Sequence, residues 1–343
     1  MSSRAFSVFF LVVGGLVFSL LLYLGSFAGG IVRSPGGDAA PVTFSVLKNE
    51  SLGDISRDLQ SKGLIVSPRT FEVYVWLRGW SRSLQAGEYT LGFDLNIREL
   101  AQILASGMDA ANERTITVIE GWTIDDIASY LEQHGIVSRA DFKQALARLA
   151  DHQAVSVLAD KPDSASLEGY LFPDSYRIFK GASADEIAQK MLITLDRKLT
   201  PDLREAITKR GQSIFTTLTI ASILEKEIRD AADLPIAADV IYKRLNSGEL
   251  LQSDATLNYV LAVGDKKPQL TSEDLKNQSL YNTYVHPGLP PGPISNPGLN
   301  AIKAAIFPDT NDYWYFLTDK DGHTHFAKDY ETHLQSKRLY LTK

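Results

Sequence analysis

The chain has 343 residues and a formal net charge of −6, and it contains no cysteine. That length can supply two or three domains with a substantial apolar core. The absence of cysteine excludes disulfides, thiolate catalysis and cysteine-based metal sites. The chain is acidic overall, and its Lys and Arg residues are scattered rather than clustered in a basic patch. No nucleic-acid partner is therefore expected.

The N-terminal segment reads as a membrane anchor. No charged residue lies between Arg4 and Arg33, and Phe6 to Phe27 is almost continuously apolar. About 20 such residues span a bilayer as a helix, whereas the apolar part of a cleaved signal peptide usually has about 7–15. A cleaved signal peptide is the alternative. We expect a cytoplasmic stub, a transmembrane helix and a Gly- and Pro-rich linker, at residues 1–5, 6–27 and 28–41 respectively.

A short unit then occurs twice, at an offset of 72 residues. Each copy has an alternating strand, a Ser or Thr N-cap, an amphipathic helix, a Gly that ends it and a second helix. The matching residues are Thr43–Val46 and Thr115–Val118, Ser51 and Thr123, Gly63 and Gly135, and Pro68–Leu77 and Arg139–Leu149. The repeat predicts two related small α/β modules. We assign them to residues 42–110 and to 111–205, the latter including a connecting region.

The remaining elements are predicted from caps and turn signals. Helices are expected from Ser183 to Leu199, from Ile214 to Ile228, from Leu234 to Ser247 and from Asn300 to Ile306, with a hairpin around Asp319–Gly322. The aromatic stretch Ser166–Ile178 contains a Pro-Asp step that predicts either a pocket-lining turn or a buried loop. Residues 206–343 would form the last domain.

Glu225 is the candidate functional residue of this domain. On a helical wheel it lies on the stripe formed by Ile214, Leu218 and Ala221. A carboxyl group on a core-facing stripe loses hydration, which raises its pKa and favours the protonated form that a general acid needs. The alternative is an ion pair with Arg229, one turn further on. Glu227 points to a different side of the same helix.

Five motifs, in this order, resemble the endolytic murein transglycosylases of the MltG, or YceG-like, family. They are Glu168–Asp174, Ala221–Glu227, Leu251–Asp254, Tyr281–Tyr284 and Gly288–Ile294. The resemblance runs from the apolar N-terminal segment nearly to the C-terminus. It implies an α+β protein of the inner membrane, with LysM-like modules and an extracytoplasmic catalytic domain.

The implied activity is cleavage within nascent peptidoglycan glycan strands to leave 1,6-anhydro-muramoyl ends. The family's catalytic glutamate maps onto Glu225. The sugar's C6 hydroxyl acts as nucleophile, so a second protein carboxylate is not required. The implied partners are glycan strands, the cytoplasmic membrane and, as candidates, peptidoglycan synthases. No cofactor is expected. The candidate substrate-binding residues are Gln252, Ser253, Asp254, Asn282, Tyr284, Leu289, Pro290 and Gly292.

Two other functions remain open at this stage. One is a non-enzymatic peptidoglycan-binding scaffold, and the other is a muramidase that cleaves the same bond with water. His323, His325 and His333 could suggest a metal site, but the sequence lacks an acidic partner at a spacing such as H-E-x-x-H, so no metal is expected.

Overall fold

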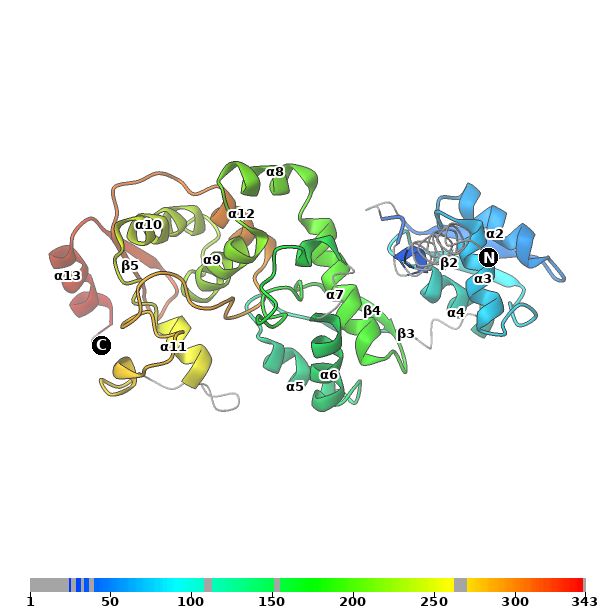
Figure 1. Ribbon diagram of the computed structural model, residues 1–343, viewed down its shortest axis with the longest axis horizontal. Coiled ribbons are helices and arrows are strands. Elements are labelled where there is room, and N and C mark those ends of the chain that lie inside the picture. The colour runs from blue at the N-terminus through cyan, green and yellow to red at the C-terminus, as the bar shows by residue number, and fades with distance from the viewer. Residues whose placement is uncertain are drawn as a thin grey trace, which may run out of the picture. The chain divides into compact units, whose positions relative to one another are not determined.

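The computed structural model describes residues 25, 29–31, 34–36, 40–107, 113–150, 155–261 and 270–341 (Figure 1). The chain divides into two compact units, residues 1–112 and 113–343. Helices and two-stranded antiparallel sheets occur in both units, which confirms the α+β fold class. Apart from Gly25, the anchor predicted at 6–27 lies outside the described residues. None of the described helices combines the length and the apolar character that crossing a bilayer requires.

The first unit is a small layer of helices against one strand pair. Strand β1 runs antiparallel to β2, and the register places Phe44 opposite Tyr89. Both side chains are buried in a core shared with the helices, of which Leu59 and Leu100 are fully enclosed members. The elements are β1 (Val42–Val46), α2 (Leu52–Ser61), α3 (Pro68–Leu77), β2 (Gly87–Leu91) and α4 (Ile97–Ser106).

The second unit begins with the same order of strand, two helices and strand. Ser51 caps α2 and Thr123 caps α5, each with its side chain on a backbone amide three residues ahead. Gly63 and Gly135 follow these helices with φ of 72° and 61°, a conformation that glycine adopts readily. The repeat is therefore present as predicted. Its second copy contains β3 (Glu113–Thr117), α5 (Ile124–Gln133), α6 (Arg139–Ala150) and β4 (Ser175–Phe179), and β3 pairs with β4.

One continuous apolar core extends from Ile116 to Ile306. The second repeat copy and the helices that follow it thus share a single interior, and the boundary placed at residue 206 stays a prediction. The remaining elements of this unit are η2 (Ser156–Leu158), α7 (Ala184–Lys198), α8 (Pro201–Lys209), α9 (Ile214–Glu227), α10 (Leu234–Ser247), α11 (Asp254–Leu261), η3 (Asp274–Lys276), α12 (Leu299–Ile306), β5 (Tyr315–Thr318), β6 (Thr324–Ala327) and α13 (Tyr330–Tyr340).

Several of these elements match the predictions, and others were missed. Helices α7 and α10 begin and end near the predicted residues, and β5 and β6 form the predicted hairpin. Strand β4 was read only as part of an aromatic loop. Helix α8 was missed because Pro201 was interpreted as a stop, whereas proline is equally favoured in the first turn of a new helix.

Helix α9 occupies the centre of the second unit, where α8, α10, α11 and α12 pack around it (Figure 1). Every residue from Thr217 to Leu224 is buried. The helix is therefore buried on all sides and has no single apolar stripe. The helical wheel that singled out Glu225 assumed one buried stripe, and the packing does not show it. Ile220 and Ile223, on the side assigned to Glu227, are as buried as Leu218 and Ala221.

We predict that Leu224→Ala strongly destabilises the second unit. Leu224 has 0% exposure in α9, and truncating such a side chain typically costs about 2–5 kcal/mol of unfolding free energy. Chemical denaturation followed by circular dichroism measures this loss. The matched control is Leu339→Ala, because Leu339 is 59% exposed and should change stability by less than about 0.5 kcal/mol. Equal effects of the two variants would contradict the central position of α9.

Candidate active site

The Glu225 side chain lies at the start of helix α12. Its Oε2 accepts a hydrogen bond of 2.9 Å from the backbone amide of Gly298, the N-cap residue of that helix. Its Oε1 accepts no hydrogen bond from the described residues. The guanidinium of Arg229 is not its partner. Arg229 instead packs close to Gly322 in the hairpin turn, so the ion pair considered from the sequence is absent from the described structure.

The pKa of Glu225 is raised above its ordinary value. Burial is the main cause, and the neighbouring carboxylate of Glu120 adds to it. The Gly298 amide and the Lys226 ammonium act in the opposite direction but do not cancel the effect of burial. The side chain is only partly buried, so it keeps access to solvent. Such a carboxyl group can hold a proton and still exchange it with a bound molecule.

The loop after β3 closes over Glu225. Gly121 has a φ of 78°, and a Cβ at this position would lie 3.4 Å from Cγ of Glu225. The Lys226 ammonium donates to the carbonyl oxygen of Gly121 at 2.8 Å. Glycine thus allows the backbone of this loop to approach the carboxyl group, and Lys226 holds it there.

Glu227 serves a different helix. Its Oε1 accepts hydrogen bonds from the Ser253 hydroxyl at 2.5 Å and from the Ala255 amide at 3.3 Å, at the start of α11. The Thr318 hydroxyl donates to its backbone carbonyl at 2.6 Å. Glu225 and Glu227 are therefore held at the starts of two separate helices, α12 and α11.

The polar segments singled out by sequence lie side by side. Thr283 joins them, since its carbonyl accepts from the Gln252 amide at 3.0 Å and its hydroxyl accepts from the Ser253 amide at 3.0 Å. The Tyr284 hydroxyl donates to Asp254 Oδ1 at 2.5 Å. Gln252 and Asp254 are exposed, and Tyr284 is partly so. These three side chains offer polar groups at the surface.

The other predicted binding residues hold loops. Asn282 has 0% exposure, and its amide donates to two backbone carbonyls while its oxygen accepts from the Tyr284 amide. Pro290 and Gly292 are buried, and a Cβ at Gly292 would lie 3.3 Å from the Phe215 ring. In this conformation these three residues have no surface for a substrate. Leu289 is half-buried.

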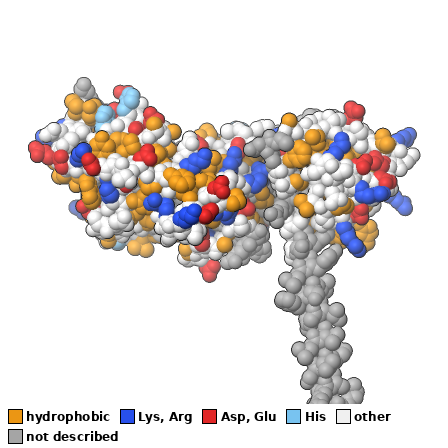
Figure 2. All heavy atoms as spheres, turned by 90° about the horizontal axis from the view of Figure 1, so that it is seen from above, with side chains coloured by type: hydrophobic (Ala, Val, Ile, Leu, Met, Phe, Trp, Pro, Cys, Tyr) orange, Lys and Arg blue, Asp and Glu red, His pale blue; other side chains and the backbone are white. Residues whose placement is uncertain are grey.

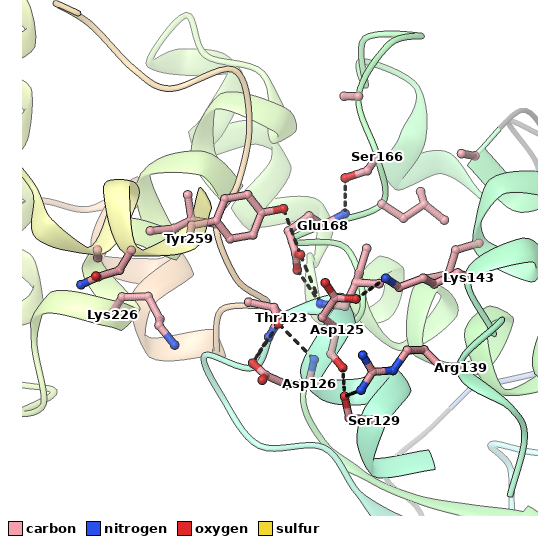
Figure 3. Close-up of a pocket in the computed structure, with 18 of the residues that line it drawn as sticks. Thr123, Asp125, Asp126, Ser129, Arg139, Lys143, Ser166, Glu168, Lys226 and Tyr259 are labelled. Atoms are coloured by element: carbon pink, nitrogen blue, oxygen red, sulfur yellow. Dashed lines mark hydrogen bonds and ion pairs between the residues drawn. The ribbon is translucent and has the colours of Figure 1, made fainter. Parts of the chain in front are cut away.

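A pocket of about 820 Å³ opens between α5, α6, the segment 164–168, the end of α9 and the start of α11. Figure 3 shows Lys226 and Tyr259 on one side of it and the α5–α6 residues on the other. Of the predicted site residues, only Asp254 lines this pocket. Glu227, which was not predicted as a site residue, lines it as well. The contribution of α5 and α6 was not foreseen. Asp125 there is paired with Lys143, and Arg139 with the Ser129 hydroxyl.

Glu168 lies at the floor of this pocket and is almost fully buried, with 4% exposure. Its carboxyl group accepts a hydrogen bond from the Tyr259 hydroxyl at 3.3 Å (Figure 3). It also accepts from the Ile124 amide at 3.1 Å and from the Asn296 side-chain amide at 3.0 Å. Burial raises its pKa to about 8, against the smaller lowering by the Ile124 amide and the Tyr259 hydroxyl.

Asn296 extends the Glu168 contact into a buried cluster. Its Nδ2 also donates to the Trp122 carbonyl at 3.0 Å, and its Oδ1 accepts from the Leu171 amide at 2.9 Å. Sequence reasoning placed Glu168 in a motif and passed over Asn296. A lone acidic residue in the apolar run Leu167–Phe172 was a usable signal, since a buried charge needs partners.

His323 and His325 have an acidic neighbour, Asp319, although not at the H-E-x-x-H spacing. Ligand atoms of Asp319, Asp321 and His323 lie within 4.8 Å of one another. Asp319 is already occupied, because it accepts from the backbone amides of Asp321 and His323 and from the His325 ring at 2.8 Å. These hydrogen bonds stabilise the β5–β6 turn, and they explain why Asp319, Asp321 and His323 lie close together.

Charge on the surface is mixed in sign. Figure 2 shows Lys and Arg side chains interspersed with Asp and Glu on the face that it presents. On that face, a dispersed pattern of this kind gives no single-sign track along which a polyanion would bind.

The chain matches the YceG-like family over residues 44–339. It belongs to this family. A Bacillus subtilis (strain 168) protein named endolytic murein transglycosylase is 32% identical over 313 residues, which cover 88% of this chain and 85% of that relative. A Streptococcus pneumoniae (strain D39) protein of the same name is 29% identical over 355 residues, covering 94% of this chain but 63% of that longer relative.

A solved structure agrees with the family assignment. The crystal structure of a putative YceG-like protein from Listeria monocytogenes has a TM-score of 0.58 and 31% sequence identity, and the match covers 86% of this chain and 98% of that one. The resemblance drawn from the five sequence motifs is thereby confirmed for the family.

We predict that Glu168 makes the stability of the second unit depend on pH. Its pKa is about 8 in the folded chain against an ordinary 4.5, so folding retains a proton between these values. The free energy of unfolding should therefore fall as pH rises through this window, by up to about 1.4 kcal/mol per pH unit. Glu168→Gln removes the titrating group and should flatten this part of the curve. Urea unfolding between pH 5 and about 8 measures it.

The control for this series is Glu205→Gln, at a carboxylate on α8 that is 65% exposed and paired with Lys209. That variant should keep the slope of the original chain. An unchanged slope in Glu168→Gln would show that the buried carboxyl group does not carry the effect.

Proposed function

We propose that this YceG-like protein is an endolytic peptidoglycan transglycosylase, a lyase that cleaves the MurNAc–GlcNAc β-1,4 bond within glycan strands. Two relatives that match this chain over most of its length are named endolytic murein transglycosylase, and this supports the reaction class. The observation that carries the proposal is the state of Glu225. It is a partly buried carboxyl group with a raised pKa, one backbone hydrogen bond and a second oxygen without a partner among the described residues.

The reaction requires one group that gives and then takes a proton. The protonated Glu225 would transfer its proton to the glycosidic oxygen as the C1–O bond breaks. The carboxylate would then accept the proton of the C6 hydroxyl while that oxygen bonds to C1, giving the 1,6-anhydro sugar. The second carboxylate of a hydrolase is replaced by the substrate's own hydroxyl. The Gly298 amide would stabilise the carboxylate between the two transfers.

The glycan would lie along the polar surface of the segments 251–254 and 281–284, which Glu227, two residues after Glu225, contacts through Ser253. Gln252, Asp254 and Tyr284 present hydrogen-bonding groups there, and Leu289 presents a half-buried apolar one. The adjacent pocket of about 820 Å³ falls within the usual range for ligand sites of about 300–1,000 Å³. We assign to it a sugar or its attached substituent next to the cleaved bond.

The N-terminal segment would tether this activity to the membrane. The apolar run from Phe6 to Phe27 has the length of a bilayer-spanning helix, with Arg4 on the side that we place in the cytoplasm. The rest of the chain would be extracytoplasmic, near newly made glycan and its synthases, and would terminate strand elongation. The two strand–helix–helix–strand copies are proposed to be LysM-like modules that orient the catalytic part.

We predict that Glu225→Gln lowers the rate of glycan-strand cleavage by roughly 100-fold to 10,000-fold, because a side-chain amide cannot donate a proton as an acid does. Digestion of purified glycan strands, with products separated by chromatography, measures this rate. Thermal unfolding should show that the variant is folded.

The matched control is Glu186→Gln. The Glu186 carboxylate also accepts a hydrogen bond from a backbone amide at a helix start, that of Ser183 at 2.8 Å, but it belongs to the cap of α7. Its substitution should leave the cleavage rate nearly unchanged. A Glu225→Gln variant that cleaves normally would remove Glu225 from the reaction, and binding without any cleavage by the unaltered chain would favour the scaffold.

A further inference from the structure

Glu120 is an exposed acidic residue on the loop that closes over Glu225. Its carboxylate lies so close to Gly298 that a Cβ added there would overlap it. Gly298 is also the residue whose amide donates to Glu225. Two acidic side chains from distant parts of the chain therefore meet at the N-cap residue of α12, one partly buried and one open to solvent.

The loop that carries Glu120 is held firmly. The Gly121 amide donates to the Asn296 carbonyl at 2.9 Å, and the Trp122 carbonyl accepts from the Asn296 backbone amide at 2.8 Å and from its side chain at 3.0 Å. Lys226 adds a bond to the Gly121 carbonyl. The hydrogen bonds at Gly121 and Trp122, the two residues after Glu120, thus fix where its side chain starts.

We infer that Glu120 is a positioning residue of the transglycosylase site, whose negative charge beside Gly298 favours the protonated form of Glu225. The inference rests on the proposed role of Glu225 as the acid. Glu120 need not touch the reacting atoms, because it acts on Glu225 through the electrostatic field. Glu120 is exposed and Glu225 is partly buried, and burial together with the charge of Glu120 raises the pKa of Glu225.

The charged groups that face Glu225 are few. The loop after β3 supplies Glu120, which raises the pKa of Glu225, and α9 itself supplies Lys226, which lowers it. Helix α12 has no acidic side chain in its first turn and contributes a backbone amide. The segment 288–298 contains no titratable side chain. Arg229 lies against the β5–β6 turn. Glu120 is therefore the neighbouring charge that favours protonation.

The direct test measures the protonation of Glu225 without substrate. Isotope-labelled glutamate carboxyl groups are followed by NMR as pH is varied, and the Glu225 signal is assigned by its loss in Glu225→Gln. Glu120→Gln should lower the pKa of Glu225, whereas Glu120→Asp, which keeps the charge, should lower it less. Glu205→Gln, at an exposed carboxylate on α8, should leave it unchanged.

The pH profile of strand cleavage gives the second readout. A general acid loses activity as pH rises through its pKa, so the alkaline limb for kcat/KM should move to lower pH in Glu120→Gln. Activity on the acidic side of that limb should be retained. A merely structural role would lower the rate at every pH and leave the limb in place.

Gly298→Ala provides an independent variant. Gly298 has an ordinary φ of −74°, so alanine is not strained there, but its methyl group would displace the flexible Glu120 side chain. The pKa of Glu225 should again fall.

An unchanged pKa and an unchanged alkaline limb in Glu120→Gln would overturn the inference while leaving the proposed function intact. Full activity of Glu225→Gln would instead overturn the proposed function, and the inference with it.

Discussion

The buried contact between Glu168 and Asn296 is the constraint on which the rest of the site depends. A carboxyl group enclosed to this degree is stable only when its hydrogen bonds are made, and here the donors come from the start of α5, from α11 and from the segment before α12. Asn296 also donates a hydrogen bond to the Trp122 carbonyl and accepts one from the Leu171 amide, so it fixes these two segments relative to Glu168. The contact thereby joins the second repeat copy to the helices around α9, and it sets the position of the loop over Glu225.

Acidic side chains at helix starts recur throughout this unit. Glu168 meets α5, Glu227 meets α11 and Glu225 meets α12, each at a backbone amide that the helix itself leaves unpaired. The three differ in how much of the carboxyl group is used. Glu168 and Glu227 make several bonds with other segments and hold them together. Glu225 makes one, and its second oxygen has no partner among the described residues.

Local signals in the sequence predicted local structure well. Ser51, Thr123 and Ser183 cap helices as expected, because a side-chain oxygen three residues before an amide is sufficient for that role. The hairpin turn at Asp319 followed for the same reason. The helical wheel and the family motifs both led to Glu225, although the residues around it in α9 are buried on every side and form no single apolar stripe. Strand β4, the pocket beside α5 and α6, and the role of Asn296 all depend on contacts between segments far apart in the chain, such as the 128 residues that separate Glu168 from Asn296, and no local pattern encodes them.

The central claim is that the sugar's own hydroxyl, and not water, completes the reaction begun by Glu225. Mass spectrometry of glycan strands digested in water enriched in heavy oxygen tests it most directly. The account predicts anhydro-muramoyl ends, each lighter than a hydrolysed end by one water and free of the heavy isotope. Reducing ends that carry the heavy oxygen would contradict it and would identify the protein as a muramidase.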